Sequence, residues 1–258
     1  MLQLSDEQKA QFKEQGYLVI PGALSQDAVA AALHATNAVI GQCLAATWAE
    51  AEQRPPKEPR PRVQPCGPDY SQEPAHLDLV NEAPVRPLIE SLLDNENNAP
   101  ITHVQVASRF PSPPGTEANA PNPHLDGWLN PVKIAPFSLL AGAVLSDIPH
   151  ENMGNFTVWP GTPNLFADYY NERTDEQLQQ EAEARVLKTG IPPIELPEPV
   201  QITARAGDLI LVHYGVAHAV APNVSPYVRY ALFYRFGWNV NRNSPYEVMR
   251  QPWLHWNI

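Results

Sequence analysis

The first hundred residues switch repeatedly between the apolar spacing of helices and that of strands. The polar, helix-favouring segment 6–15 predicts a helix, and the apolar run GYLVIPG at 16–22 predicts a short strand bounded by glycines. Apolar residues then recur at helical spacing over 25–50, and PVRPLIESLLDN at 84–95 indicates another short helix. We therefore expect a helical N-terminal part over about residues 1–100.

From about residue 101 the pattern changes to short apolar runs separated by turn residues. These runs predict strands at 101–110, 137–148, 154–161, 200–214, 215–223 and 227–238. A polar, helix-favouring stretch interrupts them at about 165–190 and predicts a helical insertion. Helices followed by a series of short strands suit a double-stranded β-helix, the jelly-roll or cupin-like core, with helices packed outside it. The predicted fold class is therefore mainly β with flanking helices, in a single domain over 1–258 whose jelly-roll core covers about 101–240.

The 29 prolines argue against an all-helical fold, and a hydrophobic content of 43% is enough for a sizeable core. Many of these prolines lie in EQRPPKEPRPRVQPCGPDYSQEP at 52–74, which predicts a long loop. Loops of this length inside a domain are commonly functional or disordered. We expect 52–74 and the insertion at 165–190 to be either lids over the barrel mouth or plain surface excursions.

A net charge of −11 argues against a nucleic-acid binder, because phosphate contacts need a basic face. No apolar run reaches the roughly 18 residues of a membrane span, and the N-terminus lacks the pattern of a signal peptide. Cys43 and Cys66 have no metal-site spacing and are compatible with a reducing cytosol. We expect a cytoplasmic protein that binds neither nucleic acid nor membrane and acts on a small-molecule substrate; no pattern indicates its oligomeric state.

The stretch NPHLDGWLNP places His124 and Asp126 two positions apart in a proline-bracketed segment. In an extended chain two such side chains share one face. By itself the pair fits an ordinary solvated turn as well as part of a metal site. The C-terminal third adds His218 and, further along, Arg229. His213 has the wrong parity for the face of His218 and is interpreted as a core residue or as a support for the site.

Two histidines and one carboxylate on a facial triangle, with the other positions open, are the ligands of non-haem Fe(II) oxygenases. Arg229 adds a fixed cation in a predicted strand, suited to bidentate binding of the far carboxylate of a dicarboxylate. Alternation along YVRYALFYRF puts Arg229, Ala231, Phe233 and Arg235 on one face of that strand. Both faces are largely apolar, so the strand is expected to be buried and its Arg229 to need an anionic partner.

The chain resembles the phytanoyl-CoA dioxygenase (PhyH-like) family of Fe(II)/2-oxoglutarate-dependent oxygenases. FKEQGYLVIPGALS resembles the N-terminal signature of that family, and HLDGW resembles its His-x-Asp motif. GDLILVHYGVAHAVAPNVSPYVRYALFYRF resembles its run from Gly-Asp through the distal histidine to the cosubstrate arginine. The resemblance implies that His124, Asp126 and His218 bind Fe(II), that Arg229 binds the cosubstrate 2-oxoglutarate, and that O2 reacts at the iron. It implies hydroxylation of an unactivated C–H bond of a small-molecule metabolite, with release of succinate and CO2.

Five further residues are candidates because of their position in the predicted strands. Gln105 and Thr157 are expected to contact the cosubstrate, and Arg109, Trp128 and Trp159 to line the substrate pocket. The alternative for Gln105 and Arg109 is a solvated strand edge, and for Trp128 it is plain core. The facing of Thr157 and Trp159 depends on strand register, which the sequence alone does not determine.

Three other functions stay open on the sequence. The first keeps iron and 2-oxoglutarate but ends in desaturation, cyclisation or epimerisation. The second is a non-catalytic barrel that binds a metal or small ligand, against which the intact triad and Arg229 argue. The third is a zinc hydrolase that uses the same three ligands and has no use for Arg229. The identity of the substrate is not indicated.

Overall fold

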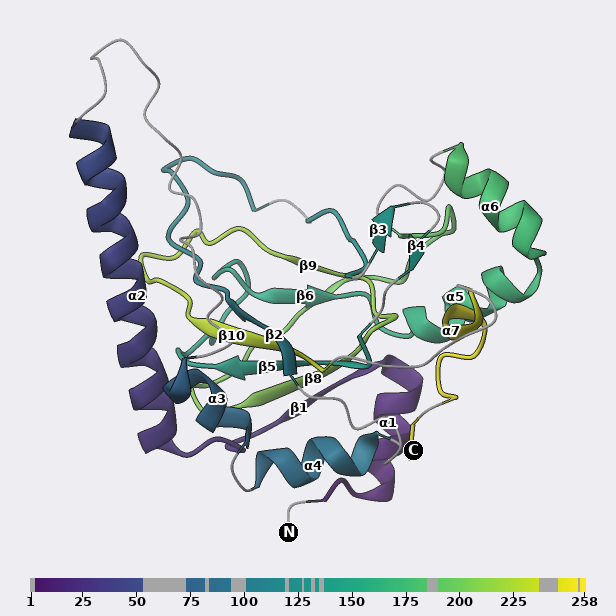
Figure 1. Cartoon of the computed structure of the whole chain (residues 1–258), viewed down its shortest axis with the longest axis horizontal. Coiled ribbons are helices and arrows are strands. Elements are labelled where there is room, and N and C mark those ends of the chain that lie inside the picture. The colour runs from purple at the N-terminus through teal and green to yellow at the C-terminus, as the bar shows by residue number, and fades with distance from the viewer. Residues whose placement is uncertain are drawn as a thin grey trace.

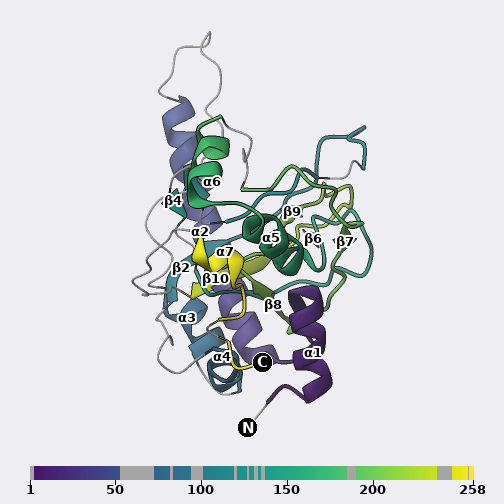
Figure 2. The ribbon, with the colours of Figure 1, turned by 90° about the vertical axis from the view of Figure 1, so that its right-hand side faces the viewer.

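The computed structural model describes most of the chain (Figures 1 and 2). The described residues are 3–52, 73–81, 84–93, 101–118, 121–126, 128–130, 133–134, 137–184, 190–236, 246–254 and 256–258, without the side chains of 43–52, 102, 128–130 and 133–134. The loop predicted at 52–74 therefore lies almost wholly outside the described residues.

Helices flank a central group of strands, with α1 and α4 below the sheets, the long α2 along one side, and α5 to α7 at the opposite end (Figure 1). The helices are α1 Asp6–Gln15, α2 Gln26–Glu52, α3 Pro74–Asn81, α4 Val85–Leu92, α5 Thr162–Asn171, α6 Asp175–Glu183 and α7 Glu247–Arg250. Within the described ranges, no helix combines the length and the apolar character needed to cross a bilayer.

The strands form antiparallel sheets. They are β1 Tyr17–Ile20, β2 Ile101–Val106, β3 Trp128–Asn130, β4 Lys133–Ile134, β5 Leu139–Val144, β6 Phe156–Val158, β7 Val200–Gln201, β8 Leu209–His213, β9 His218–Val220 and β10 Ala231–Phe236. A five-stranded sheet has the order β1-β8-β5-β10-β2, a three-stranded sheet has the order β7-β6-β9, and β3 pairs with β4. The prediction of a mainly β fold with flanking helices is confirmed at this level.

The two larger sheets face each other across an aromatic contact. Phe233 of β10 packs against Phe156 of β6, with their ring centroids 4.9 Å apart. On the other face of β10, the hydroxyl of Tyr234 donates a hydrogen bond to the backbone carbonyl of His76 in α3. The alternation predicted for this strand therefore holds: Phe233 and Arg235 point between the sheets, and Tyr234 points to the helices.

The helical insertion begins earlier than the predicted 165–190. Helix α5 starts at Thr162 because Gly161 adopts a left-handed conformation with φ 76° and Pro163 suits the first turn of a helix. Helix α6 follows after a short turn and begins with a capping box built on Thr174. The insertion is therefore two short helices, and both lie at the same end of the sheets (Figure 1).

Candidate metal centre

Backbone pairing brings two distant histidines together. His124 forms an isolated antiparallel bridge with His218 at the start of β9, and each backbone N–H donates to the other residue's carbonyl at 3.0 Å. The carboxylate of Asp126 lies beside both rings, with Oδ1 3.5 Å from Nε2 of His124 and Oδ2 3.7 Å from Nε2 of His218. One possible ligand atom from each side chain lies within 4.8 Å of the others. The three predicted ligands therefore converge.

The imidazole of His218 is oriented by the protein behind it. Its Nδ1 lies 3.0 Å from the carbonyl oxygen of Val216 and donates to it, which directs Nε2 toward Asp126 and makes Nε2 the candidate ligand atom. The ring also packs against Phe156, with centroids 5.2 Å apart. The side chain of His218 is 6% exposed, whereas that of His124 is 45% exposed. One histidine is thus part of the core and the other faces solvent.

The carboxylate of Asp126 is held by Arg235, to which the sequence had assigned no role. Nε of Arg235 donates to Oδ2 of Asp126 at 3.0 Å, and its Nη2 donates to the same oxygen. Burial raises the pKa of the Asp126 carboxyl, but hydrogen bonds to His124 and His218 and the charges of His218 and Arg235 lower it well below its usual range. The carboxylate is therefore ionised and suited to a cation. Its predicted position on the same strand face as Arg229 was the available signal.

Arg229 lies in the core, with 3% of the residue exposed. Its Nε donates to the carbonyl of Gly154 at 2.7 Å and its Nη1 donates to the carbonyl of Ala107. Its Nη2 is buried and has no hydrogen-bond partner among the described residues. Burial, followed by repulsion from Arg109, lowers the pKa of Arg229 to about 9. Because a buried cation with an unpaired N–H is unfavourable, this position is suited to an anionic ligand.

Two of the predicted binding residues, Gln105 and Arg109, lie in or just after β2, which is paired with the segment that contains Arg229 and β10. Gln105 in β2 is opposite Phe233, and its Oε1 accepts a hydrogen bond from Nη2 of Arg235 at 3.0 Å. Arg109 is exposed, and its backbone pairs with that of Arg229. The predicted contacts of Gln105 with cosubstrate and of Arg109 with substrate stay predictions.

The register of β6 fixes the facing of Thr157. Val158 pairs with His218, whereas Thr157 pairs with Ala219. Paired residues point to the same face, so the side chain of Thr157 points away from the histidine, and its hydroxyl donates to the carbonyl of Asn155. We therefore leave Thr157 out of the cosubstrate site proposed below.

Two tryptophans, Trp128 and Trp159, are predicted to line the substrate pocket. Trp159 follows β6, is 5% exposed, and donates its backbone N–H to the carbonyl of Ala217. Trp128 opens β3, but its side chain lies outside the described residues. Both roles stay predictions.

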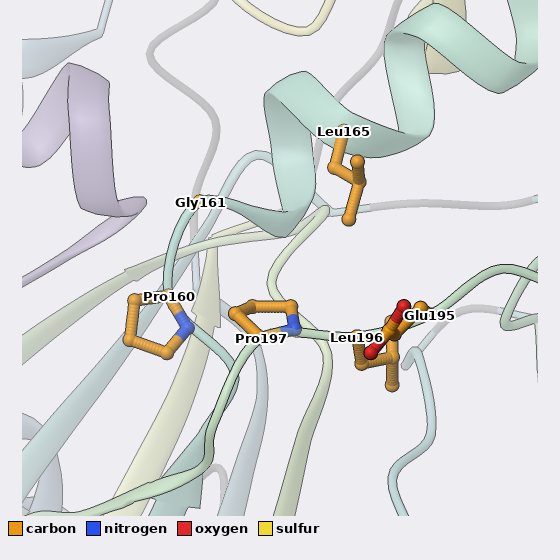
Figure 3. Close-up of a pocket in the computed structure, with 6 residues that line it drawn as sticks. All are labelled: Pro160, Gly161, Leu165, Glu195, Leu196 and Pro197. Atoms are coloured by element: carbon orange, nitrogen blue, oxygen red, sulfur yellow. The ribbon is translucent and has the colours of Figure 1, made fainter.

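A separate open depression lies beside the start of α5 (Figure 3). Its lining comes from the turn before and the first turns of α5 and from a proline-flanked segment before β7: Pro160, Gly161, Leu165, Glu195, Leu196 and Pro197. None of the three converging ligands borders it, so it is distinct from the candidate metal centre.

Solved structures of similar fold support this architecture. SnoN, a non-heme alpha ketoglutarate dependent epimerase from nogalamycin biosynthesis, matches with a TM-score of 0.55 and 18% identity over 89% of this chain and 80% of its own. EctD from S. alaskensis matches with a TM-score of 0.55 and 19% identity over 90% and 76%. SnoK, a non-heme alpha ketoglutarate dependent carbocyclase, matches with a TM-score of 0.50 and 21% identity over 90% and 84%. At these identities the likeness establishes the fold.

No curated protein sequence matches the chain. The family comparison is more informative, because residues 12–231 match the phytanoyl-CoA dioxygenase (PhyH) family. This range contains the histidine pair, the carboxylate between them and the buried arginine. The chain therefore belongs to the phytanoyl-CoA dioxygenase family of Fe(II)/2-oxoglutarate-dependent enzymes, as its motifs predict.

Proposed function

We propose that this protein hydroxylates an unactivated C–H bond of a small-molecule metabolite, using Fe(II), 2-oxoglutarate and O2 and releasing succinate and CO2. The observation that carries the proposal is the convergence of His124, Asp126 and His218 beside the sheets that bury Arg229, whose Nη2 has no hydrogen-bond partner among the described residues. The proposal includes a single domain over 1–258, in which the two larger sheets form a jelly-roll core.

His124, Asp126 and His218 would hold the iron, since two imidazoles and one carboxylate with open positions suit non-haem Fe(II). Arg229 would bind the far carboxylate of 2-oxoglutarate, because its buried Nη2 lacks a partner among the described residues. Iron and cosubstrate, when bound, supply the oxidising chemistry with O2. The residues fit both groups: the ionised carboxylate is matched to the cation and the buried guanidinium to the anion.

The chain itself supplies orientation and an apolar lining. The hydrogen bond from Nδ1 of His218 to the carbonyl of Val216 would keep Nε2, the proposed metal ligand, directed at Asp126. Phe156 and Phe233 lie against each other between the sheets, and Phe156 covers one face of the His218 ring. Aromatic side chains at this position exclude water from one side of the centre, which strengthens the electrostatic interactions inside it.

A second outcome uses the same residues and cofactors. SnoN is described as an epimerase and SnoK as a carbocyclase, and both share this fold. The alternative is therefore desaturation, cyclisation or epimerisation in natural-product biosynthesis, because the outcome depends on where the substrate places its hydrogen and its radical. Product analysis by mass spectrometry distinguishes the two, since hydroxylation adds one oxygen atom to the substrate.

The direct test measures succinate formed from 2-oxoglutarate with added Fe(II), across a panel of small metabolites. We expect at least one compound to stimulate succinate release, and we expect His124→Ala to abolish it. His150→Ala is the matched control, because His150 is exposed and outside the triad. Succinate release that survives in His124→Ala at the wild-type rate contradicts the proposal. A substrate turned over equally well without oxygen points instead to a zinc hydrolase.

A further inference from the structure

The carboxylate of Asp126 has little support from its own backbone. The residue lies in a turn after the bridge at His124 and outside all described strands. A side chain on such a turn keeps several rotamers unless something else restrains it. His218, in contrast, is fixed by the ladder of β9 and by its own hydrogen bond to Val216.

The restraint on this carboxylate comes from Arg235 in β10. This strand lies inside the five-stranded sheet, between β5 and β2 (Figure 1). The guanidinium donates to Oδ2 of Asp126 through both Nε and Nη2, which is the fork geometry that arginine provides and lysine does not. It is held in turn by Oε1 of Gln105 at 3.0 Å and lies 5.7 Å from the ring centroid of Phe137.

We propose that Arg235 is a positioning residue that locks the Asp126 carboxylate in its metal-binding orientation. By engaging Oδ2 with two N–H groups, Arg235 leaves Oδ1, on the side of His124, as the oxygen that ligates the metal through a single bond. A metal held by one carboxylate oxygen would keep more positions for cosubstrate than one held by both. Gln105 is the outer residue of this series of hydrogen bonds and holds the guanidinium of Arg235. The inference rests on the proposed metal site and adds a residue to it.

Two effects of removing Arg235 have opposite signs. Loss of its positive charge removes a repulsion on the incoming divalent cation and by itself tightens metal binding. Loss of the restraint lets the Asp126 carboxylate rotate and weakens metal binding. Asp126 lies on a turn, and its carboxylate is held by β10 of the five-stranded sheet. We therefore expect the loss of the restraint to outweigh the loss of charge repulsion, so that metal binding weakens.

The experiment titrates the purified protein with Mn(II) by isothermal calorimetry, without 2-oxoglutarate, so that binding is measured apart from turnover. Arg235→Met should raise the Kd for Mn(II) by about 10- to 100-fold, the usual range for partners of metal ligands. Arg235→Lys, which keeps the charge but not the fork, should lie between Arg235→Met and wild type. Gln105→Leu changes no charge at an exposed position, and it should raise the Kd by a smaller factor in the same direction.

The visible absorption of bound Co(II) gives a second readout, because it depends on ligand number and geometry. We expect a changed spectrum in Arg235→Met and an unchanged one in Arg205→Met, where the arginine is exposed and is not among the residues that contact the three candidate ligands. Mn(II) binding that is equal to wild type or tighter in Arg235→Met overturns the inference. If Arg235→Met does not fold, an unchanged Kd in Gln105→Leu overturns it. His124→Ala separates the two proposals: if it binds Mn(II) normally, the metal site itself is wrong.

Discussion

Replacing Arg229 with Met removes a buried charge that has no acidic partner among the described residues. The residue is 3% exposed, and burial, together with the nearby Arg109, lowers its pKa from 12.5 to about 9. A shift of this size corresponds to a cost of about 5 kcal/mol for keeping the guanidinium charged at neutral pH. Hydrogen bonds to the carbonyls of Gly154 and Ala107 offset part of this cost. A carboxylate at Nη2 would offset more, and this is the role proposed for 2-oxoglutarate.

The magnitude follows from linkage between binding and folding. In wild-type protein loaded with Mn(II), 2-oxoglutarate at 100 times its Kd should stabilise the fold by about 2.7 kcal/mol. For a chain of this size that is a rise in Tm of roughly 5–11 °C. In Arg229→Met the binding free energy should fall by about 2–5 kcal/mol, as when one partner of a buried charge pair is truncated. The Kd for 2-oxoglutarate then rises by about 30-fold or more, and the Tm shift at the same concentration falls to about a third of the wild-type shift or less.

Differential scanning fluorimetry with and without 2-oxoglutarate measures this directly. Arg205→Met is the matched control, because the same substitution at an exposed arginine should leave the ligand-induced Tm shift unchanged. Arg229→Met should still bind Mn(II), since Arg229 is not a ligand. An equal rise in Tm with 2-oxoglutarate in Arg229→Met and in wild type refutes the proposed role of Arg229 in binding the cosubstrate.

Two further predictions concern the packing of the core. Burial lowers the pKa of His213 to about 3, whereas the unfolded histidine titrates near 6.5. Between pH 7 and pH 5 this histidine therefore binds a proton in the unfolded chain but not in the folded one. The free energy of unfolding should fall by about 2 kcal/mol over this range. Urea unfolding at both pH values should show this loss in wild type but not in His213→Gln. An equal loss in both proteins argues against His213 as its source. A Cβ at Gly142 would lie 2.7 Å from Cε1 of Phe233, so Gly142→Ala should lower the free energy of unfolding by about 1–3 kcal/mol, and adding Phe233→Leu should restore part of it.

Local patterns predicted much of the architecture. The strand at 16–22 and the helices at 25–50 and 84–95 correspond to β1, α2 and α4. Each has a signal within a few residues: an apolar run between glycines in the first case and helical spacing of apolar residues in the others. Helix α5 was placed too late, because its start is set by Gly161 and Pro163, which also suit a turn.

The site was predicted as far as it depends on motif and alternation. The candidate ligands and Arg229 were chosen from residue type and spacing, and the alternation along the strand put Arg235 on the same face as Arg229. Its partner could not be found in that way, because Asp126 lies on a distant turn whose position relative to β10 depends on the assembled sheets. The facing of Thr157 could not be predicted for a related reason: in a strand of three residues, a shift of one residue exchanges the two faces.

The three proposed ligands are held by different parts of the fold, so one side of the site is buried and another is exposed to solvent. His218 is inside the sheet sandwich, with its ring against Phe156 and its side chain 6% exposed. Asp126 is tied across to the five-stranded sheet by Arg235. His124 alone of the three is open to solvent, with 45% of its side chain exposed. We therefore expect a ligand to reach the centre from the side of His124, whereas Phe156 belongs to the core. His124→Ala should weaken Mn(II) binding in calorimetry, and Phe156→Ala should lower the free energy of unfolding in urea.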